Sequence, residues 1–167
     1  MAVNRRSQLL SAAVLGAVLA GTGAAVWRSL QPADVRTPGA HDLRPEDPKV
    51  VAAGQQVYVA HCAACHGANL EGQPDWKQRR PNGRLPAPPH DETGHTWHHP
   101  DEQLFRMTKL GVARIAGIQG YESDMPAFEG VLSDEQIVAV LSWIKAQWPD
   151  AVRLQHNAIN RRVRAGY

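Results

Sequence analysis

The stretch that decides the fold is Cys62-Ala63-Ala64-Cys65-His66. Two thiols at this spacing can add to the two vinyl groups of one haem, while the histidine that follows reaches the iron. The chain of 167 residues has only these two cysteines, so they cannot belong to a scattered disulfide framework. The motif predicts one covalently attached haem c, anchored on Cys62 and Cys65, with His66 as an iron ligand.

Three other interpretations of the two cysteines compete with haem attachment. They are a thioredoxin-like redox pair, half of a zinc site and an accidental disulfide. A thioredoxin-like pair is expected in a βαβ context, which the surrounding sequence lacks. A zinc site built from four cysteines needs thiols that the chain does not contain. Haem attachment is therefore favoured over all three.

A haem iron that carries electrons needs a second axial ligand, and a thioether sulfur suits it because sulfur favours the ferrous state. Met1 lies outside the predicted core, which leaves Met107 and Met125. Met107 falls in register with apolar residues of a short helix and is interpreted as core packing. Met125 precedes Pro126 in a loop shortly before the last core helix, so it is the predicted ligand. Met107, a histidine and an open iron position remain alternatives.

The residues before the motif predict a helix that leads directly into it. Asp47 offers an N-cap and Pro48 a first helical residue for a run from 49 to about 60. One face of that run is apolar or small, and consists of Val50, Gly54, Val57 and Tyr58. The absence of a side chain at Gly54 would let another helix approach closely.

Two more helices are predicted after the motif. A short one over residues 101–110 is stopped by Gly111. A longer one begins at a capping box formed by Ser133 and Gln136. Its apolar residues recur at helical spacing: Ile137, Val140, Leu141, Ile144 and Trp148. Residues 77–100, rich in Pro, Gly and His, are predicted to form one long irregular loop.

With these features the sequence resembles the class I cytochromes c over roughly residues 46–149. In that family a glycine and an aromatic residue of the first helix pack against the last helix, and Gly54 and Tyr58 stand in those places. The ligand methionine precedes the last helix, as Met125 does. Four-helix cytochromes instead carry the motif near the C-terminus, whereas about a hundred residues follow it here. The resemblance implies an all-α fold wrapped around one haem.

The resemblance also implies a proline whose carbonyl accepts the proton on the second ring nitrogen of His66 and so holds the ring orientation. Pro88 is the candidate, and Pro86 is the alternative. The chain departs from the compact family pattern in its long 75–100 insertion and in its basic C-terminal segment. These departures are expected to encode the choice of partner.

The insertion carries a histidine-rich loop in which four histidines and two acids crowd together: His90, Asp91, Glu92, His95, His98 and His99. Such a cluster could bind copper or zinc, although its spacing is not diagnostic. The favoured interpretation is a loop folded over the haem edge. In that arrangement Trp97 donates its indole N–H to a haem propionate or simply packs in the core.

The N-terminus predicts export. Twenty-one uncharged residues lie between Arg6 and Arg28, and as a helix they would extend ~31 Å, which matches a bilayer core. Arg5 and Arg6 precede this stretch, so the positive-inside rule places the rest of the chain outside the cytoplasm. An uncleaved membrane anchor is favoured over a cleaved signal peptide, because the apolar stretch continues to Trp27.

The predicted organisation has four parts: a signal-anchor over 1–28, a linker over 29–46, a haem domain over 47–150 and a basic tail over 151–167. Residues 46–150 hold 9 Lys and Arg against 14 Asp and Glu, whereas the tail holds four Arg and no acid. Nucleic acid is therefore excluded as a partner, and a redox protein with a basic surface is favoured.

The predicted function is one-electron transfer in an extracytoplasmic respiratory chain, without chemical conversion of a substrate. The chain could also be a docked subunit of an oxidase or dehydrogenase. Two alternatives of a different kind are a haem enzyme such as a peroxidase, which needs an open iron position, and a metal-handling or sensing protein that uses the histidine-rich loop.

Overall fold

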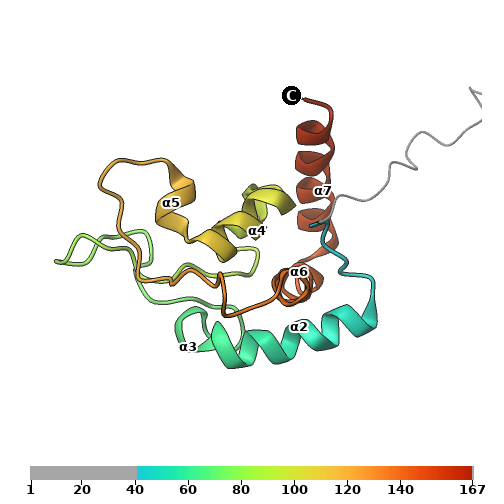
Figure 1. Ribbon diagram of the computed structural model, residues 1–167, viewed down its shortest axis with the longest axis horizontal. Coiled ribbons are helices and arrows are strands. Elements are labelled where there is room, and N and C mark those ends of the chain that lie inside the picture. The colour runs from blue at the N-terminus through green and yellow to red at the C-terminus, as the bar shows by residue number, and fades with distance from the viewer. Residues whose placement is uncertain (1–40, 167) are drawn as a thin grey trace, which may run out of the picture. The chain divides into compact units, whose positions relative to one another are not determined.

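The computed structural model describes residues 41–166, and this part of the chain contains helices and no β-strand (Figure 1). The elements are α2 (Pro48–His61), α3 (Ala63–His66), the 3-10 turn η1 (Thr96–His98), α4 (Asp101–Leu110), α5 (Val112–Ala116), α6 (Asp134–Ala146) and α7 (Asp150–Arg164). The predicted all-α class is confirmed. The predicted N-terminal span lies outside the described residues, and none of the helices within residues 41–166 is long and apolar enough to cross a membrane.

Local sequence signals explain where α2 and α6 begin. The Asp47 side chain accepts hydrogen bonds from the backbone N–H groups of Lys49 and Val50, and Pro48 occupies the first turn. At the start of α6, Ser133 and Gln136 form the reciprocal capping box, which satisfies two backbone N–H groups that the helix itself leaves unpaired. Both predicted caps are confirmed.

Helices α2 and α6 form the centre of the domain. In Figure 1, α6 is seen end-on while α2 lies across the view beneath it, so the two helices cross steeply. Their contact is close because Gly54 has no side chain: a Cβ built there would lie 2.0 Å from the carbonyl oxygen of Ala139. Tyr58, one turn further along α2, is fully buried in the same contact.

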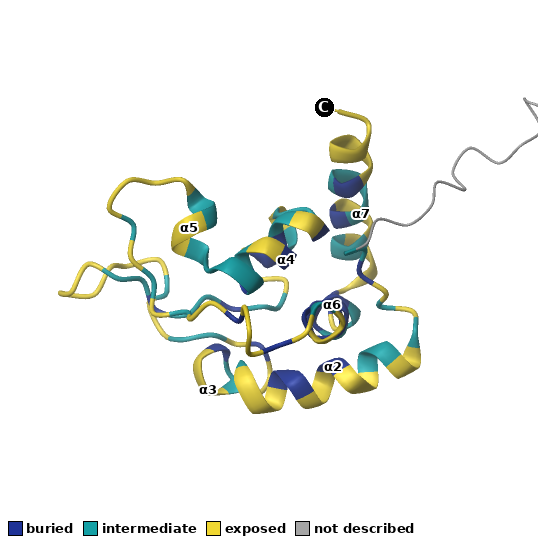
Figure 2. Cartoon of the chain, in the orientation of Figure 1, coloured by how far each residue is buried: buried dark blue, intermediate teal, exposed yellow. Residues whose placement is uncertain are grey.

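The apolar core lies between α2, α4 and α6, on the faces coloured dark blue in Figure 2. Each of the five apolar residues predicted to line the last core helix is buried: Ile137, Val140, Leu141 and Ile144 on α6, and Trp148 just beyond its end. Leu104 and Phe105 of α4 and Phe128 also belong to this core. The burial of these apolar side chains away from water is the main contribution that stabilises the packing of the helices.

The basic segment after Pro149, predicted only as a tail, is folded in the structure. It forms the 15-residue helix α7, whose buried side chains are His156 and Asn160. The sequence pattern did not reveal these two buried positions, because the burial of His156 and Asn160 depends on polar groups that other elements supply, and hydrophobic periodicity does not detect such groups.

Those polar groups form a buried cluster centred on Asp101. One carboxylate oxygen of Asp101 accepts a hydrogen bond from the Asn160 side chain at 2.9 Å and lies 3.7 Å from Nζ of Lys145 and 3.4 Å from Nε2 of His156. The other oxygen accepts from the backbone N–H of Leu43 at 3.0 Å. The cluster thereby joins α4, α6 and α7 through polar contacts removed from water.

The burial of His156 predicts a pH-dependent stability. Burial, with the neighbouring Lys145 ammonium, lowers the pKa of His156 from 6.5 to about 4, against the opposing effect of Asp101. Between these two pH values the unfolded chain binds more protons than the folded one, so acidification through this window destabilises the fold, by up to about 3 kcal/mol. The free energy of unfolding, measured by urea titration from pH 7 to pH 4, is expected to fall less steeply in His156→Gln than in the native chain.

The matched control for this experiment is His61→Gln, which replaces an exposed histidine at the end of α2. This variant is expected to keep the native pH slope. An equally steep slope in the His156→Gln variant would show that the buried histidine does not set the acid sensitivity.

The chain enters the domain through a short anchored segment, residues 41–47, much of which was expected to be linker. Leu43 is buried, and the backbone N–H of Arg44 donates to the Ser142 hydroxyl on α6 at 2.9 Å. Ion pairs join Asp42 to Arg164 and Glu46 to Arg153, both on α7. A single buried leucine gives no periodic signal, which is why the sequence pattern did not reveal this attachment.

Candidate haem site

The motif cysteines and histidine lie on one short turn of helix that continues from α2. In α3 the backbone N–H groups of Cys65 and His66 donate to the Cys62 carbonyl at 3.1 and 2.9 Å. The turn ends at Gly67, whose φ of +84° is a conformation that favours glycine. The Tyr58 hydroxyl donates to the Gly67 carbonyl at 2.8 Å, so α2 also fixes the end of the motif.

The His66 ring is oriented by a hydrogen bond from a distant loop. Its Nδ1 lies 2.9 Å from the carbonyl oxygen of Pro88, which is the contact expected for the candidate proline. Since a carbonyl only accepts, Nδ1 carries the proton and Nε2 keeps its lone pair. Burial lowers the pKa of His66, and the Pro88 hydrogen bond opposes this. The ring is therefore neutral at physiological pH, which is the form that binds a metal.

Both cysteines are present as thiols rather than as a disulfide. Cys65 is exposed, and Cys62 packs against the apolar core. Burial, with a further contribution from Cys65, raises the pKa of the Cys62 thiol to about 11. A thioredoxin-like pair works through a thiol whose pKa is lowered. The environment of Cys62 therefore disfavours that alternative.

Met125 lies in the loop between α5 and α6. Its side chain is half-buried and packs against the same apolar cluster as Cys62. Its backbone N–H donates to the Ser123 hydroxyl at 3.1 Å. Met107, the alternative ligand, is on α4 next to the buried Thr108. The core thus brings the predicted second ligand and the cysteine motif to one apolar cluster, although 59 residues separate Met125 from His66.

Comparison with known proteins identifies the family. The model of the cytochrome c family matches residues 51–148, which is more than half of the chain. The chain belongs to the cytochrome c family. No match was found among curated proteins or among solved structures. Membership means that this cytochrome binds a c-type haem covalently, through the motif that Cys62 and Cys65 form, and serves haem-based electron transfer.

The residues of the cytochrome fit this haem. Two unpaired thiols lie about one turn apart, on Cys62 at the N-cap of α3 and on Cys65 within it. The imidazole that follows them keeps one ring nitrogen for a metal, while the Pro88 carbonyl holds the other. Thiols for covalent attachment and a neutral imidazole oriented by a backbone carbonyl are the donor set that a c-type haem requires.

The histidine-rich loop has a different geometry from a metal site. Within residues 41–166 no group of three or more His, Cys, Asp or Glu side chains is placed to hold a metal ion. The His95 ring lies near the rings of His98 and His99, with centroids 5.2 and 4.7 Å away. Burial and the neighbouring histidines lower the pKa values of His95 and His99. This loop therefore gives no support to the metal-handling alternative.

Trp97, predicted to donate to a propionate or to pack in the core, makes local contacts. Its indole N–H donates to the carbonyl of Glu92 at 3.2 Å, and its ring stacks on His98 with centroids 3.7 Å apart. Its side chain also packs partly against the apolar core. The structure therefore shows packing of Trp97, and its contact with a propionate stays a prediction.

His90 is a residue of the site that sequence patterns assigned only to the histidine-rich loop. Its ring stacks on the His66 ring with centroids 3.9 Å apart and an angle of 19° between the planes. Its Nδ1 lies 2.6 Å from the Thr96 hydroxyl, and its carbonyl accepts from the Trp148 indole at 2.7 Å. Burial, followed by the nearby His66, lowers the pKa of His90 well below its usual range. A neutral, anchored ring therefore supports His66 from the side.

Proposed function

We propose that this cytochrome is a one-electron carrier of an extracytoplasmic respiratory chain, with His66 and Met125 as the two axial ligands of its haem iron. The bound haem supplies a couple of ferric and ferrous iron. The observation that carries the proposal is the His66 ring, which is neutral, buried and fixed by Pro88 beside two free thiols. A ligand held in this way keeps its position in both oxidation states, which favours electron transfer over ligand exchange.

Met125 makes a carrier more plausible than a haem enzyme. A peroxidase-like enzyme needs an open iron position for its substrate. Met125 packs against the same core as the motif, from a loop fixed on its C-terminal side by α4, where the N–H of Phe128 donates to the Thr108 carbonyl at 3.1 Å. A half-buried thioether held near the motif is suited to close that position.

The Met125→Ala variant tests this assignment. The haem is expected to remain attached, while the sulfur-to-iron charge-transfer band disappears and the reduction potential falls by on the order of 0.1 V or more, because a thioether ligand favours ferrous iron. Visible absorption and potentiometric titration of the purified holoprotein measure both effects. Met107→Ala is the matched control and is expected to keep the band. If instead the native protein has a high-spin spectrum and Met125→Ala leaves that spectrum unchanged, the iron has an open position, which would favour an enzyme.

Placement outside the cytoplasm is supported by the sequence alone, through the uncharged stretch between Arg6 and Arg28. The proposed state is a haem domain tethered to the membrane by that stretch. The denatured intact mass of the protein from membrane and soluble fractions of its host tests this point. A full-length chain with one haem in the membrane fraction supports the tether, whereas loss of about the first two dozen residues indicates a diffusing carrier after signal cleavage.

The proposed partners are redox proteins with a basic docking surface, including a respiratory complex to which the chain could dock as a subunit. The support is the excess of acids over bases in residues 46–150, 14 against 9. Association driven by such charge weakens as salt rises. The rate of electron exchange with host membranes is expected to fall as NaCl increases, and co-purification tests the docked state.

A further inference from the structure

The loop that presents Met125 is held by side chains on one side and by the main chain on the other. After Met125, the N–H groups of Phe128 and Glu129 donate to the carbonyls of Thr108 and Lys109 on α4, at 3.1 and 2.9 Å. Before Met125, the side chains of Glu122 and Asp124 reach across to a second loop, which belongs to the long insertion. The position of Met125 therefore depends on contacts between two loops.

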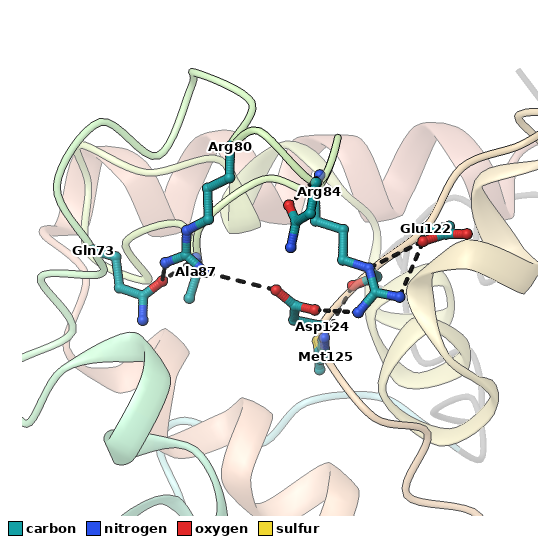
Figure 3. A network of polar contacts seen from close by, with 9 residues as sticks. Gln73, Arg80, Arg84, Ala87, Glu122, Asp124 and Met125 are labelled. Carbon is teal, nitrogen blue, oxygen red and sulfur yellow. Dashed lines mark hydrogen bonds and ion pairs between the residues drawn. The ribbon is translucent and has the colours of Figure 1, made fainter.

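Arg84 makes the principal contact. Its Nε and Nη2 donate to one oxygen of Glu122 at 3.1 and 3.0 Å, and its Nη1 donates to Asp124 at 2.6 Å. Figure 3 shows the guanidinium lying between the two carboxylates. Three donors thus hold two residues of the Met125 loop, one of which adjoins Met125.

A second arginine extends the contact toward the other side of the site. Nη1 of Arg80 lies 3.6 Å from Asp124, and its Nη2 donates to the Gln73 side-chain oxygen at 2.8 Å. That oxygen also accepts from the backbone N–H of Ala87 at 2.9 Å, and the Gln73 N–H donates to the Ala87 carbonyl at 2.9 Å. Ala87 directly precedes Pro88, the residue that orients His66.

These residues form one continuous polar frame: Gln73, Arg80, Arg84, Ala87, Glu122 and Asp124 (Figure 3). The frame joins the loop that orients His66 to the loop that presents Met125. Each of these contacts has a residue of the 75–100 insertion as one partner. This insertion is the part of the chain that departs from the compact family pattern.

We propose that Arg84 is a positioning residue that keeps Met125 on the haem iron. The inference rests on the proposed role of Met125 as axial ligand. Arg84 does not touch the reacting atoms itself, and it acts by restricting the loop through Glu122 and Asp124. A guanidinium suits this task because its planar fork donates to two carboxylates at once, which an ammonium cannot do with the same geometry.

The frame is accessible to water, which makes its effect dependent on salt. The Arg84, Glu122 and Asp124 side chains are 38, 67 and 43% exposed. Contacts of this kind contribute little to global stability, but they can shift the balance between an attached and a detached loop. Their loss is therefore expected to alter ligation of the iron more than unfolding of the domain.

The test compares the Arg84→Gln holoprotein with the native holoprotein in low salt. Added imidazole binds only when the sulfur has left the iron, so its apparent dissociation constant falls as the detached fraction rises, and a decrease of about threefold or more is expected. The sulfur-to-iron charge-transfer band is expected to weaken in parallel. The urea midpoint and the haem-containing mass are expected to stay near native values. Arg84→Lys should give an intermediate imidazole affinity.

Arg106→Gln is the matched control. Arg106 is an exposed arginine of α4 that forms no ion pair with any other described residue, so this change removes the same charge without touching the frame. Its imidazole affinity is expected to equal that of the native protein. In about 1 M NaCl, where the screening length is ~3 Å, the native protein should approach the behaviour of Arg84→Gln.

Met125→Ala, measured in the same series, separates the assignment of Met125 as the axial ligand from the positioning role of Arg84. If Met125→Ala loses the band while Arg84→Gln behaves as the native protein or as Arg106→Gln, then Met125 is the ligand and Arg84 does not position it. If Met125→Ala keeps the native band, the ligand assignment fails and the role of Arg84 fails with it. A lowered urea midpoint in Arg84→Gln with unchanged imidazole affinity would also overturn the proposal, because it would reveal a purely structural role.

Discussion

Replacing Asp101 by alanine is expected to destabilise the folded domain by about 3–5 kcal/mol, because it leaves a buried ammonium without its counterion. The Lys145 side chain is 4% exposed, and Nζ lies 3.7 Å from the Asp101 carboxylate. Burial lowers the pKa of Lys145, and Asp101 opposes this shift. The same substitution also removes the acceptors for Leu43 and Asn160. Urea unfolding of the holoprotein at pH 7 measures the loss.

Glu102→Ala provides the control for this prediction. Glu102 is the next residue of α4, and its 58% exposed side chain pairs with His41 at the surface. Its loss is expected to cost less than about 1 kcal/mol. A second variant, Asp101→Leu combined with Lys145→Met, removes both charges and should recover part of the lost stability. If Asp101→Ala and Glu102→Ala had similar effects, the buried cluster would not be a major source of stability.

Replacing Gly54 by alanine is expected to destabilise the domain by about 2 kcal/mol or more, although alanine is the better helix former. In an unpacked helix this change would stabilise by about 1 kcal/mol. Here the added Cβ would lie 2.0 Å from the carbonyl oxygen and 2.6 Å from the carbonyl carbon of Ala139. Because these are backbone atoms, α2 and α6 would have to separate, and overpacking of this kind costs about 1–3 kcal/mol or more.

The control for Gly54 is Ala53→Gly, at the exposed neighbouring position of α2. It is expected to destabilise by about 0.5–1 kcal/mol through helix propensity alone. Denaturant titrations of the two holoprotein variants give the change in the free energy of unfolding. If only helix propensity mattered, Gly54→Ala would raise this free energy and Ala53→Gly would lower it. A stabilised Gly54→Ala variant would show that the helices can move apart at little cost.

The parts of the fold that the sequence reveals are those determined by neighbouring residues. The caps at Asp47 and Ser133, the stop at Gly111 and the periodic core face of α6 are all local, and the structure confirms them. Helix α5 was not predicted, because five residues are too few for a periodic pattern. The two buried polar residues of α7 were not predicted, because the groups that pair with His156 and Asn160 lie 57 to 59 residues away.

In the haem site, too, the sequence reveals what neighbouring residues determine and does not reveal contacts between residues far apart in the chain. The cysteine motif is contiguous, so sequence alone indicates covalent attachment, and family membership supports it. The contact between His66 and Pro88 spans 22 residues and was inferred from resemblance rather than from any local pattern. The ion pairs of Arg84 span 38 and 40 residues. In a single sequence, nothing distinguishes these charges from a solvated surface.

The anchored segment at residues 41–47 has a mechanical consequence. A force applied to the chain at His41 acts first on the contacts that hold residues 41–47 to the domain. Helix α2 is pulled from the core only after those contacts break. His41 stacks on Phe105 of α4, Arg44 is bonded to Ser142 of α6, and Asp42 is paired with Arg164 of α7. The load is shared among three helices before it reaches Pro48, so tension on the N-terminal side is kept away from the turn that carries the haem motif.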